Sequence, residues 1–339
     1  MQIFRENIWK ENEYTYEAAY GFVPNLMAYL HEDGEDAGAA HGDASSAGGR
    51  PCMIVLPGGG YCMVVPPEGE VVAKEFYERG MNCFVLTYTT DITMSVPLKT
   101  QPMEDASRAV RYVRKNASRF GIDASKIVLC GFSAAAHMGG SLGVHFKDVK
   151  DPDPELDAIS NRPDGLILSY PVITAGEYTH IYSIQALIGK DASETEREYF
   201  SLEKNVTSDT PPCFIWQTVE DSLVPVENSM MFAEACRKAG VPYTYHAFPN
   251  GDHGLSVHNL ASRKGEFGEW YTMEQVMKAV DAVREGKGVR VSEQRRNELI
   301  EQFSEPMPEM PEGVAPEFKD VAMWPDLAQI WMESLWRAQ

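Results

Sequence analysis

Short apolar runs without alternation are the feature that most constrains how this 339-residue chain can fold. They stand at 51–61, 81–88, 126–132, 164–173 and 212–221, and each is about as long as one strand. Segments with helical spacing, such as the pair Val72 and Phe76, separate most of them. A strand that is apolar on both sides must be covered on both sides. The sequence therefore predicts an α/β fold with a mostly parallel central sheet and helices on both faces.

The chain is expected to form one domain over residues 1–339. With 44% hydrophobic residues it can build a large core. The segment 33–50 is rich in Gly, Ala, Ser and Asp and has no periodicity, so it predicts a mobile loop and not a domain boundary. Residues 176–210 and 258–320 do not fit the strand–helix alternation. Each is either a lid or an outer cover.

Two helices are expected near the end of the sequence. One has Met273, Val276, Met277 and Val280 on its apolar face. The other carries the stripe Leu327, Ile330, Trp331 and Leu335, and we expect it to dock on the sheet.

Charge and composition exclude several partners. The 50 acidic residues against 30 basic ones give a formal charge of −20, which repels nucleic acid and anionic membrane surfaces. No segment approaches the roughly 18 apolar residues of a membrane span, and no basic-then-apolar leader opens the sequence, so a cytoplasmic location is expected. The six cysteines show no CxxC spacing, which argues against a zinc site or a disulfide framework. A homo-oligomer is compatible with the sequence.

The stretch "KIVLCGFSAAAHMGG" (126–140) places a polar residue, Ser133, where a predicted strand becomes a predicted helix. Gly131 and Ala135 flank it, which fits the G-x-S-x-G nucleophile elbow with alanine at the second small position. Small residues are needed there because the tight turn brings the strand and helix backbones together. By itself the match is weak, and an ordinary turn explains it about as well.

An oxyanion hole is the second feature that the elbow requires. The helix after Ser133 directs free N–H groups to its start, so the N–H of Ala134 is one expected donor. "PGGGY" (57–61) follows an earlier strand, and Gly59 and Gly60 are the expected further donors. An ordinary glycine-rich turn is the alternative.

The acid and the base are expected in the order Ser, Asp, His. Asp221 ends the predicted strand in "TVEDSLVP", and His253 lies in "FPNGDHGL" after the strand-like "YTYHAF". Glu220 is the alternative to Asp221, while Asp252 adjoins His253 and is not expected to face it. His137 lies one helical turn beyond Ser133 and should face packing or a neighbouring carbonyl group. Tyr61, Tyr178 and His180 are the candidates for lining the substrate pocket.

The motifs "PGGGY", "GFSAAAH", "VEDSLVP" and "GDHGL" together resemble the α/β-hydrolase superfamily. More narrowly, they are similar to those of small esterases related to bacterial acetylxylan esterases. The resemblance covers roughly residues 50–257 and is weak in 1–50 and 258–320. Pro57 stands where the hormone-sensitive-lipase-like branch has the His of HGGG, and Ala135 where the elbow usually has Gly. These departures bear on which oxyanion donors act and on the width of the acyl pocket.

The resemblance implies an α/β-hydrolase fold and a serine esterase without a metal or organic cofactor. It implies hydrolysis of short acyl esters, with acetyl groups on plant-derived oligosaccharides as the expected substrate. Ser133 would be the nucleophile, His253 the general base and Asp221 the residue that orients the imidazole. Two alternatives stay open: an amidase of the arylformamidase type, which uses the same triad, and a catalytically silent binding protein with this fold.

Overall fold

A single mixed sheet forms the centre of the molecule in the computed structural model, which describes residues 1–10, 12–32, 49–304 and 313–337. Its strands are β1 (Gln2–Asn7), β2 (Asn25–Leu30), β3 (Arg50–Leu56), β4 (Asn82–Thr87), β5 (Ile122–Phe132), β6 (Gly165–Ser169), β7 (Cys213–Thr218) and β8 (Tyr243–Phe248). They lie side by side in the order β1-β2-β4-β3-β5-β6-β7-β8. The predicted loop at 33–50 lies outside the described residues except for its last two positions, and Arg50 already belongs to β3.

The pairing changes from antiparallel to parallel once along this order. From β4 to β8 all neighbours are parallel, whereas β1 and β2 join the β4 edge in antiparallel pairs. The central strands β4, β6 and β7 are buried at every position. These are the apolar runs without alternation that predicted a mostly parallel sheet, and the prediction is confirmed.

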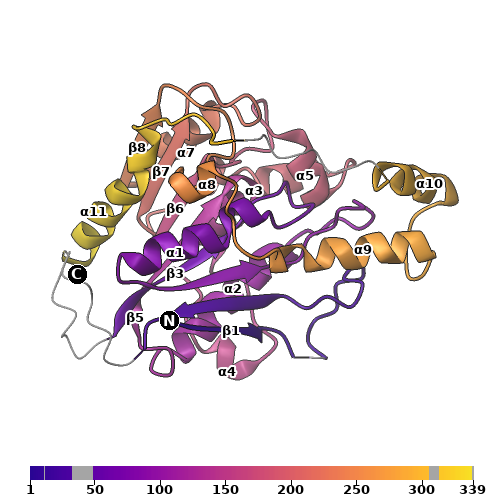
Figure 1. Cartoon of the computed structure of the whole chain (residues 1–339), viewed down its shortest axis with the longest axis horizontal. Coiled ribbons are helices and arrows are strands. Elements are labelled where there is room, and N and C mark those ends of the chain that lie inside the picture. Colours follow the sequence, from indigo (N-terminus) through magenta and orange to yellow (C-terminus); the bar gives the residue numbers. More distant parts are fainter. Residues whose placement is uncertain (11, 33–48, 305–312, 338–339) are drawn as a thin grey trace.

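Helices cover both faces of the sheet, as predicted (Figure 1). One face is covered by α1 (Glu70–Glu78) and α11 (Trp324–Arg337), whose Phe76 and Trp324 belong to one apolar cluster. The other face is covered by α2 (Gln101–Lys115), α3 (Ser133–His145) and α7 (Glu227–Ala239), which share the second cluster. Gly240, with φ of 72°, ends α7 in the left-handed conformation that a glycine adopts without strain.

The two long segments outside the alternation fold into short helices. Residues 176–210 contain α5 (Ile181–Ile188), α6 (Glu194–Tyr199) and the 3₁₀ turn η2 (Leu202–Lys204). Residues 258–320 contain α8 (Leu260–Arg263), η3 (Tyr271–Met273), α9 (Glu274–Glu285) and α10 (Glu293–Gln302), and residues 305–312 lie outside the described chain. In Figure 1, α10 lies at the opposite end of the view from α11. The remaining short elements are η1 (Pro66–Glu68), α4 (Pro154–Asp157) and η4 (Val321–Met323).

The apolar faces of the two late helices differ in part from the predicted ones. In α9, Val276 is buried as expected but Met277 is 63% exposed, because the buried Gln275 bonds to the backbone of Thr90 and fixes the rotation of the helix. The final helix docks on the sheet as predicted. It does so through Trp324, which stacks on Trp216 with ring centroids 5.2 Å apart, while Ile330 is exposed. In the described parts of the chain, none of the helices is long and apolar enough to cross a membrane.

Candidate active site

The predicted elbow is present at Ser133. This residue is the first of α3, directly after β5, and its φ of 53° is in the left-handed region that a residue with a side chain rarely adopts. A Cβ atom on Gly131 would lie 2.6 Å from the carbonyl oxygen of Ala135, so no larger residue fits there. Ala135 itself is fully buried. The close approach of strand and helix is therefore the reason for the small residues, as the sequence predicted.

Three side chains from three loops meet at this turn. The Nε2 atom of His253 lies 2.8 Å from the Oγ atom of Ser133. Its Nδ1 atom lies 2.7 Å from Oδ2 of Asp221. Asp221 follows β7 and His253 follows β8, so the two come from neighbouring strands of the sheet. The structure thus brings together the residues that the sequence named for the triad.

The carboxylate of Asp221 is held on every side. Its Oδ1 atom accepts hydrogen bonds from the backbone N–H groups of Leu223 at 3.0 Å and Val224 at 2.8 Å. Its Oδ2 atom accepts one from Nε2 of Gln217 at 3.2 Å in addition to the contact with His253. The side chain has no exposed surface. Because all its partners other than the imidazole are donors, the imidazole nitrogen that faces Oδ2 is placed to carry a proton.

The competing carboxylates have other partners. Asp252 accepts hydrogen bonds from the N–H and Oγ of Ser222 and from the N–H of His253, and the Ser222 backbone bond lowers the pKa of Asp252 most. It therefore ties the two loops together without reaching the imidazole. The Oε2 atom of Glu220 faces the N–H of Gly251 at 3.4 Å.

His137 points away from the reacting groups. Its Nε2 atom lies 2.9 Å from the carbonyl oxygen of Phe200, and its Nδ1 atom lies 2.8 Å from the hydroxyl of Tyr61. Burial lowers the pKa of His137 to about 4, so the ring is neutral at pH 7. Neutral imidazole fits both contacts, because Nε2–H donates to the carbonyl and Nδ1 accepts from the hydroxyl.

The glycine loop after β3 lies against Ser133. A Cβ atom built on Gly58 would lie 3.0 Å from the Cβ atom of Ser133. Gly59 and Gly60 have φ angles of 127° and 65°, and within the described chain their N–H groups donate to no acceptor. Ala134 is the second residue of α3, where a backbone N–H has no partner inside the helix. These are the three groups that the sequence named as oxyanion donors.

The three candidates for pocket lining differ in position. Tyr61 is buried and its hydroxyl is committed to His137, so its side chain fills the interior and is not available to a substrate. His180 is partly buried, and its Nδ1 atom lies 2.7 Å from the Oγ of Ser183. Burial lowers the pKa of His180, and the nearby His253 lowers it further. Tyr178 is partly exposed and lies two residues before His180.

Two residues of the site were missed in the sequence. Glu68 is buried at the end of η1, and its carboxylate accepts a hydrogen bond from the N–H of Gly58 at 2.7 Å. Tyr170, directly after β6, packs its ring against the imidazole of His253 with centroids 4.8 Å apart. The only signal for Glu68 was a charged residue between apolar segments, and "SYP" gave none for Tyr170.

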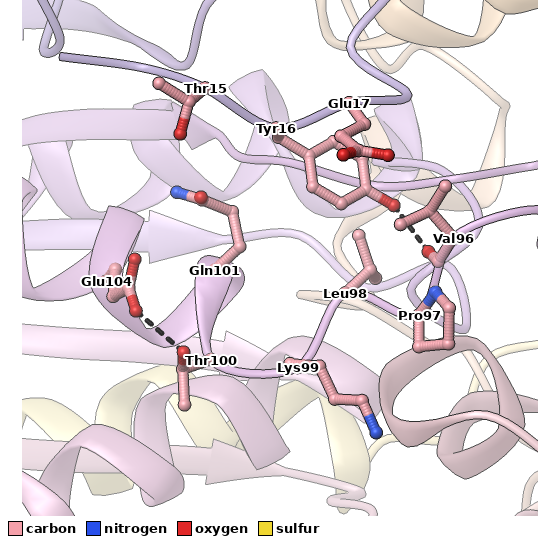
Figure 2. Close-up of a pocket in the computed structure, with 10 residues that line it drawn as sticks. All are labelled: Thr15, Tyr16, Glu17, Val96, Pro97, Leu98, Lys99, Thr100, Gln101 and Glu104. Atoms are coloured by element: carbon pink, nitrogen blue, oxygen red, sulfur yellow. Dashed lines mark hydrogen bonds between the residues drawn. The ribbon is translucent and has the colours of Figure 1, made fainter. Parts of the chain in front are cut away.

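An open hollow of about 260 Å³ lies elsewhere, between the 15–17 and 96–104 segments (Figure 2). Two of the polar side chains along it are already paired: the hydroxyl of Tyr16 donates to the carbonyl of Val96, and Thr100 donates to Glu104. It contains none of the triad residues. Across the described residues, no three His, Cys, Asp or Glu side chains are grouped so that they could hold a metal ion.

The chain is similar to several known proteins. Residues 42–236 match the BD-FAE family. The chain is 59% identical over 280 residues to endo-1,4-beta-xylanase B of Butyrivibrio fibrisolvens, a match that covers 83% of this chain and 42% of that protein. It is 28% identical over 209 residues to an acetylxylan esterase of Xylanibacter ruminicola, covering 60% of this chain and 38% of that protein. The chain thus spans less than half the length of these two relatives.

The match to one solved structure includes nearly the whole of that chain. The acetyl ester-xyloside bifunctional hydrolase from Caldicellulosiruptor lactoaceticus is 33% identical and superposes with a TM-score of 0.67 over 84% of this chain and 96% of that one. The resemblance to α/β-hydrolase esterases that the motifs predicted is confirmed. With more than half of its residues matched, the chain belongs to the BD-FAE family and has the α/β-hydrolase fold.

Proposed function

We propose that the chain is a serine carboxylic ester hydrolase that removes short acyl groups, acetyl above all, through an acyl-enzyme. One observation carries the proposal: an unbroken line of hydrogen-bonding contacts runs from Asp221 through His253 to the Oγ of Ser133. This is the arrangement in which a serine hydroxyl can pass its proton to an imidazole as it attacks a carbonyl carbon.

In the acylation step, Oγ of Ser133 bonds to the ester carbonyl carbon while Nε2 of His253 takes the hydroxyl proton. The imidazolium that forms is stabilised by the Asp221 carboxylate at 2.7 Å. The negative charge on the carbonyl oxygen is met by the N–H groups of Gly59, Gly60 and Ala134. The carbon–oxygen bond to the alcohol then breaks, and the same proton passes from His253 to the leaving oxygen.

In the deacylation step, water replaces the alcohol. His253 takes a proton from the water as its oxygen attacks the acyl carbon, and the proton then returns to Oγ of Ser133 as the acid leaves. In both steps His253 is the residue that takes up the proton and passes it on.

Two relatives indicate the substrate class. An acetylxylan esterase and an acetyl ester-xyloside bifunctional hydrolase are among the proteins that the chain matches; the first name refers to acetylated xylan, and the second joins acetyl esters with xylosides as substrates of one enzyme. We therefore propose acetylated oligosaccharides of plant origin as the substrates.

The test is hydrolysis of p-nitrophenyl acetate, butyrate and octanoate by the wild type and by Ser133→Ala. We expect the acetate to be the best substrate, with activity lost in Ser133→Ala and kept in Ser141→Ala, which removes a buried hydroxyl from the same helix. Release of acetate from acetylated xylo-oligosaccharides then tests the substrate class. Turnover that survives in Ser133→Ala, or an absence of ester turnover in the wild type, refutes the proposal, and faster hydrolysis of a formamide substrate would favour the amidase.

A further inference from the structure

The mechanism above leaves one buried acidic side chain beside the triad without a role. Glu68 is 4% exposed, and both of its carboxylate oxygens are engaged. Oε2 accepts the hydrogen bond from the N–H of Gly58 at 2.7 Å, and Oε1 accepts one from the hydroxyl of Tyr170 at 2.6 Å. Gly58 adjoins the proposed oxyanion donors, so one end of this contact lies in the glycine loop.

Tyr170 connects the same carboxylate to the histidine loop. Its ring stands nearly edge to face on the imidazole of His253, at 66° between ring planes. Its hydroxyl oxygen accepts a hydrogen bond from the N–H of Ser256 at 3.1 Å while donating to Glu68. The Oγ of Ser256 in turn donates to the carbonyl of Pro67 at 2.6 Å. The 3₁₀ turn η1, which ends at Glu68, is therefore hydrogen-bonded both to the glycine loop and, through Tyr170 and Ser256, to the histidine loop.

The backbone is strained where these contacts meet. Ser133, Tyr170 and Ser256 have φ angles of 53°, 36° and 53°, all in the left-handed region. Such conformations are unfavourable for residues with a side chain and persist only where the surroundings hold them. Ser256 is held by three hydrogen bonds, the third from Nε1 of Trp324 to its carbonyl oxygen at 2.9 Å. Removing the carboxylate that Tyr170 and Gly58 share should therefore loosen both loops.

The contacts also indicate the protonation state of Glu68. The N–H of Gly58 can only donate, and the hydroxyl of Tyr170 donates to Glu68 while its oxygen accepts from the N–H of Ser256. Both partners are thus donors, which suits a carboxylate. Burial raises the pKa of Glu68 from its ordinary value, and the hydrogen bonds from Tyr170 and Gly58, with the neighbouring His253, act in the opposite direction.

We propose that Glu68 is a positioning residue whose ionised carboxylate, acting with Tyr170, fixes the glycine loop and the His253 ring and favours the imidazolium formed during catalysis. The inference rests on the proposed esterase function. The other titratable groups around His253 are Asp221, in direct contact, and Asp252 and His180 nearby. Those around Glu68 besides Tyr170 and His253 are Tyr88 and Cys130, both neutral at pH 7 because burial raises their pKa values.

The experiment compares Glu68→Gln, Glu68→Asp and Tyr170→Phe with the wild type on p-nitrophenyl acetate. We would measure kcat and KM from pH 4 to pH 9 and normalise rates to the sites that a fluorophosphonate labels. Asp105→Asn is the matched control, because Asp105 is also a fully buried carboxylate that accepts several hydrogen bonds, from Trp9, Thr89 and Gln101.

We expect Glu68→Gln to lower kcat by about 10- to 100-fold, the range for a misplaced reacting group, with KM within threefold of the wild type. The acid limb of its kcat/KM profile should move to lower pH, because a negative charge that favours the imidazolium is gone. Glu68→Asp keeps the negative charge, but its side chain is one methylene shorter and cannot contact both Gly58 and Tyr170. Its kcat should therefore fall while the acid limb stays near the wild-type position. Tyr170→Phe should behave like Glu68→Asp.

Two results would overturn the inference: a kcat within threefold of wild type in Glu68→Gln, or a lower kcat with the acid limb unmoved. If Glu68→Gln does not fold, Tyr170→Phe decides, because wild-type kcat in that variant is incompatible with the proposed link. Failure of the esterase function is a different result, since the wild type would then show no turnover that depends on Ser133.

Discussion

Replacing Asp221 by asparagine tests the proposed division of roles in the site. The carboxylate accepts hydrogen bonds at both oxygens, with the N–H groups of Leu223 and Val224 at Oδ1 and the side chains of Gln217 and His253 at Oδ2. An amide can keep only one oxygen. The backbone donors fix that oxygen at the Oδ1 position, which leaves the NH₂ group facing Gln217 and His253.

The NH₂ group changes the protonation of the imidazole. Nδ1 of His253 must then accept a hydrogen bond, so the ring proton moves to Nε2, the atom 2.8 Å from Oγ of Ser133. A ring with its proton there cannot act as the base. Triads of this kind lose about 10⁴-fold in kcat on this change, which corresponds to roughly 5 kcal/mol of transition-state free energy.

The assay is p-nitrophenyl acetate hydrolysis at pH 7, with Asp252→Asn as the control. Asp252 is the adjacent carboxylate and bonds to Ser222 and to the N–H of His253, so its loss should lower kcat by less than about tenfold. The role proposed for Asp221 is refuted if Asp221→Asn keeps more than a tenth of wild-type kcat, or if the two variants are equally impaired.

Two further predictions concern stability. Gly131→Ala places a methyl group 2.6 Å from the backbone oxygen of Ala135. We expect the free energy of unfolding in urea to fall by about 1–3 kcal/mol and labelling by a fluorophosphonate to be lost. An unchanged urea midpoint would contradict the close packing at the elbow. The pKa of His137 lies at about 4 in the folded state, below its ordinary value of 6.5, so the unfolded chain binds the extra proton as the pH falls from about 6.5 to about 4. The contribution of His137 to the free energy of unfolding should be fully present above that window and should fall by roughly 3 kcal/mol across it. The fall should be smaller in His137→Asn. An equal pH dependence of unfolding in the wild type and this variant would contradict the low pKa of His137.

The parallel core of the fold could be predicted because a strand that is buried on both sides is apolar at successive positions. The runs that became β3, β7 and the second half of β5 contain few polar residues, and a parallel sheet between two layers of helices covers such strands on both sides. The faces of the late helices could not be predicted in the same way. Met277 and Ile330 fit an apolar stripe, yet Gln275 and Trp324 set the rotation of α9 and α11 through contacts with distant residues.

The meeting of Ser133, Asp221 and His253 could also be predicted, since order and strand context together limit where such residues can stand. The contact between Glu68 and Tyr170 could not, because the two residues are 102 positions apart and nothing near either one indicates the other. The same holds for Tyr61, whose place beside the glycine loop suggested substrate contact. Its hydroxyl instead forms a hydrogen bond with the buried His137 on α3, and only the folded structure shows that this histidine needs a partner there.

The order of the strands explains why such different residues meet. The glycine loop follows β3, Ser133 follows β5, Tyr170 follows β6, Asp221 follows β7 and His253 follows β8. These five strands are consecutive neighbours in the sheet and all run parallel, so their carboxyl ends open onto one edge. Each loop is therefore fixed by the one beside it, and a contact such as that between Glu68 and Tyr170 spans the serine between them. In contrast, β1 and β2 lie beyond β4. They contribute no triad residue, no oxyanion donor and none of the residues that bond to Glu68 or Tyr170, so substitutions there should alter activity only through the stability of the sheet.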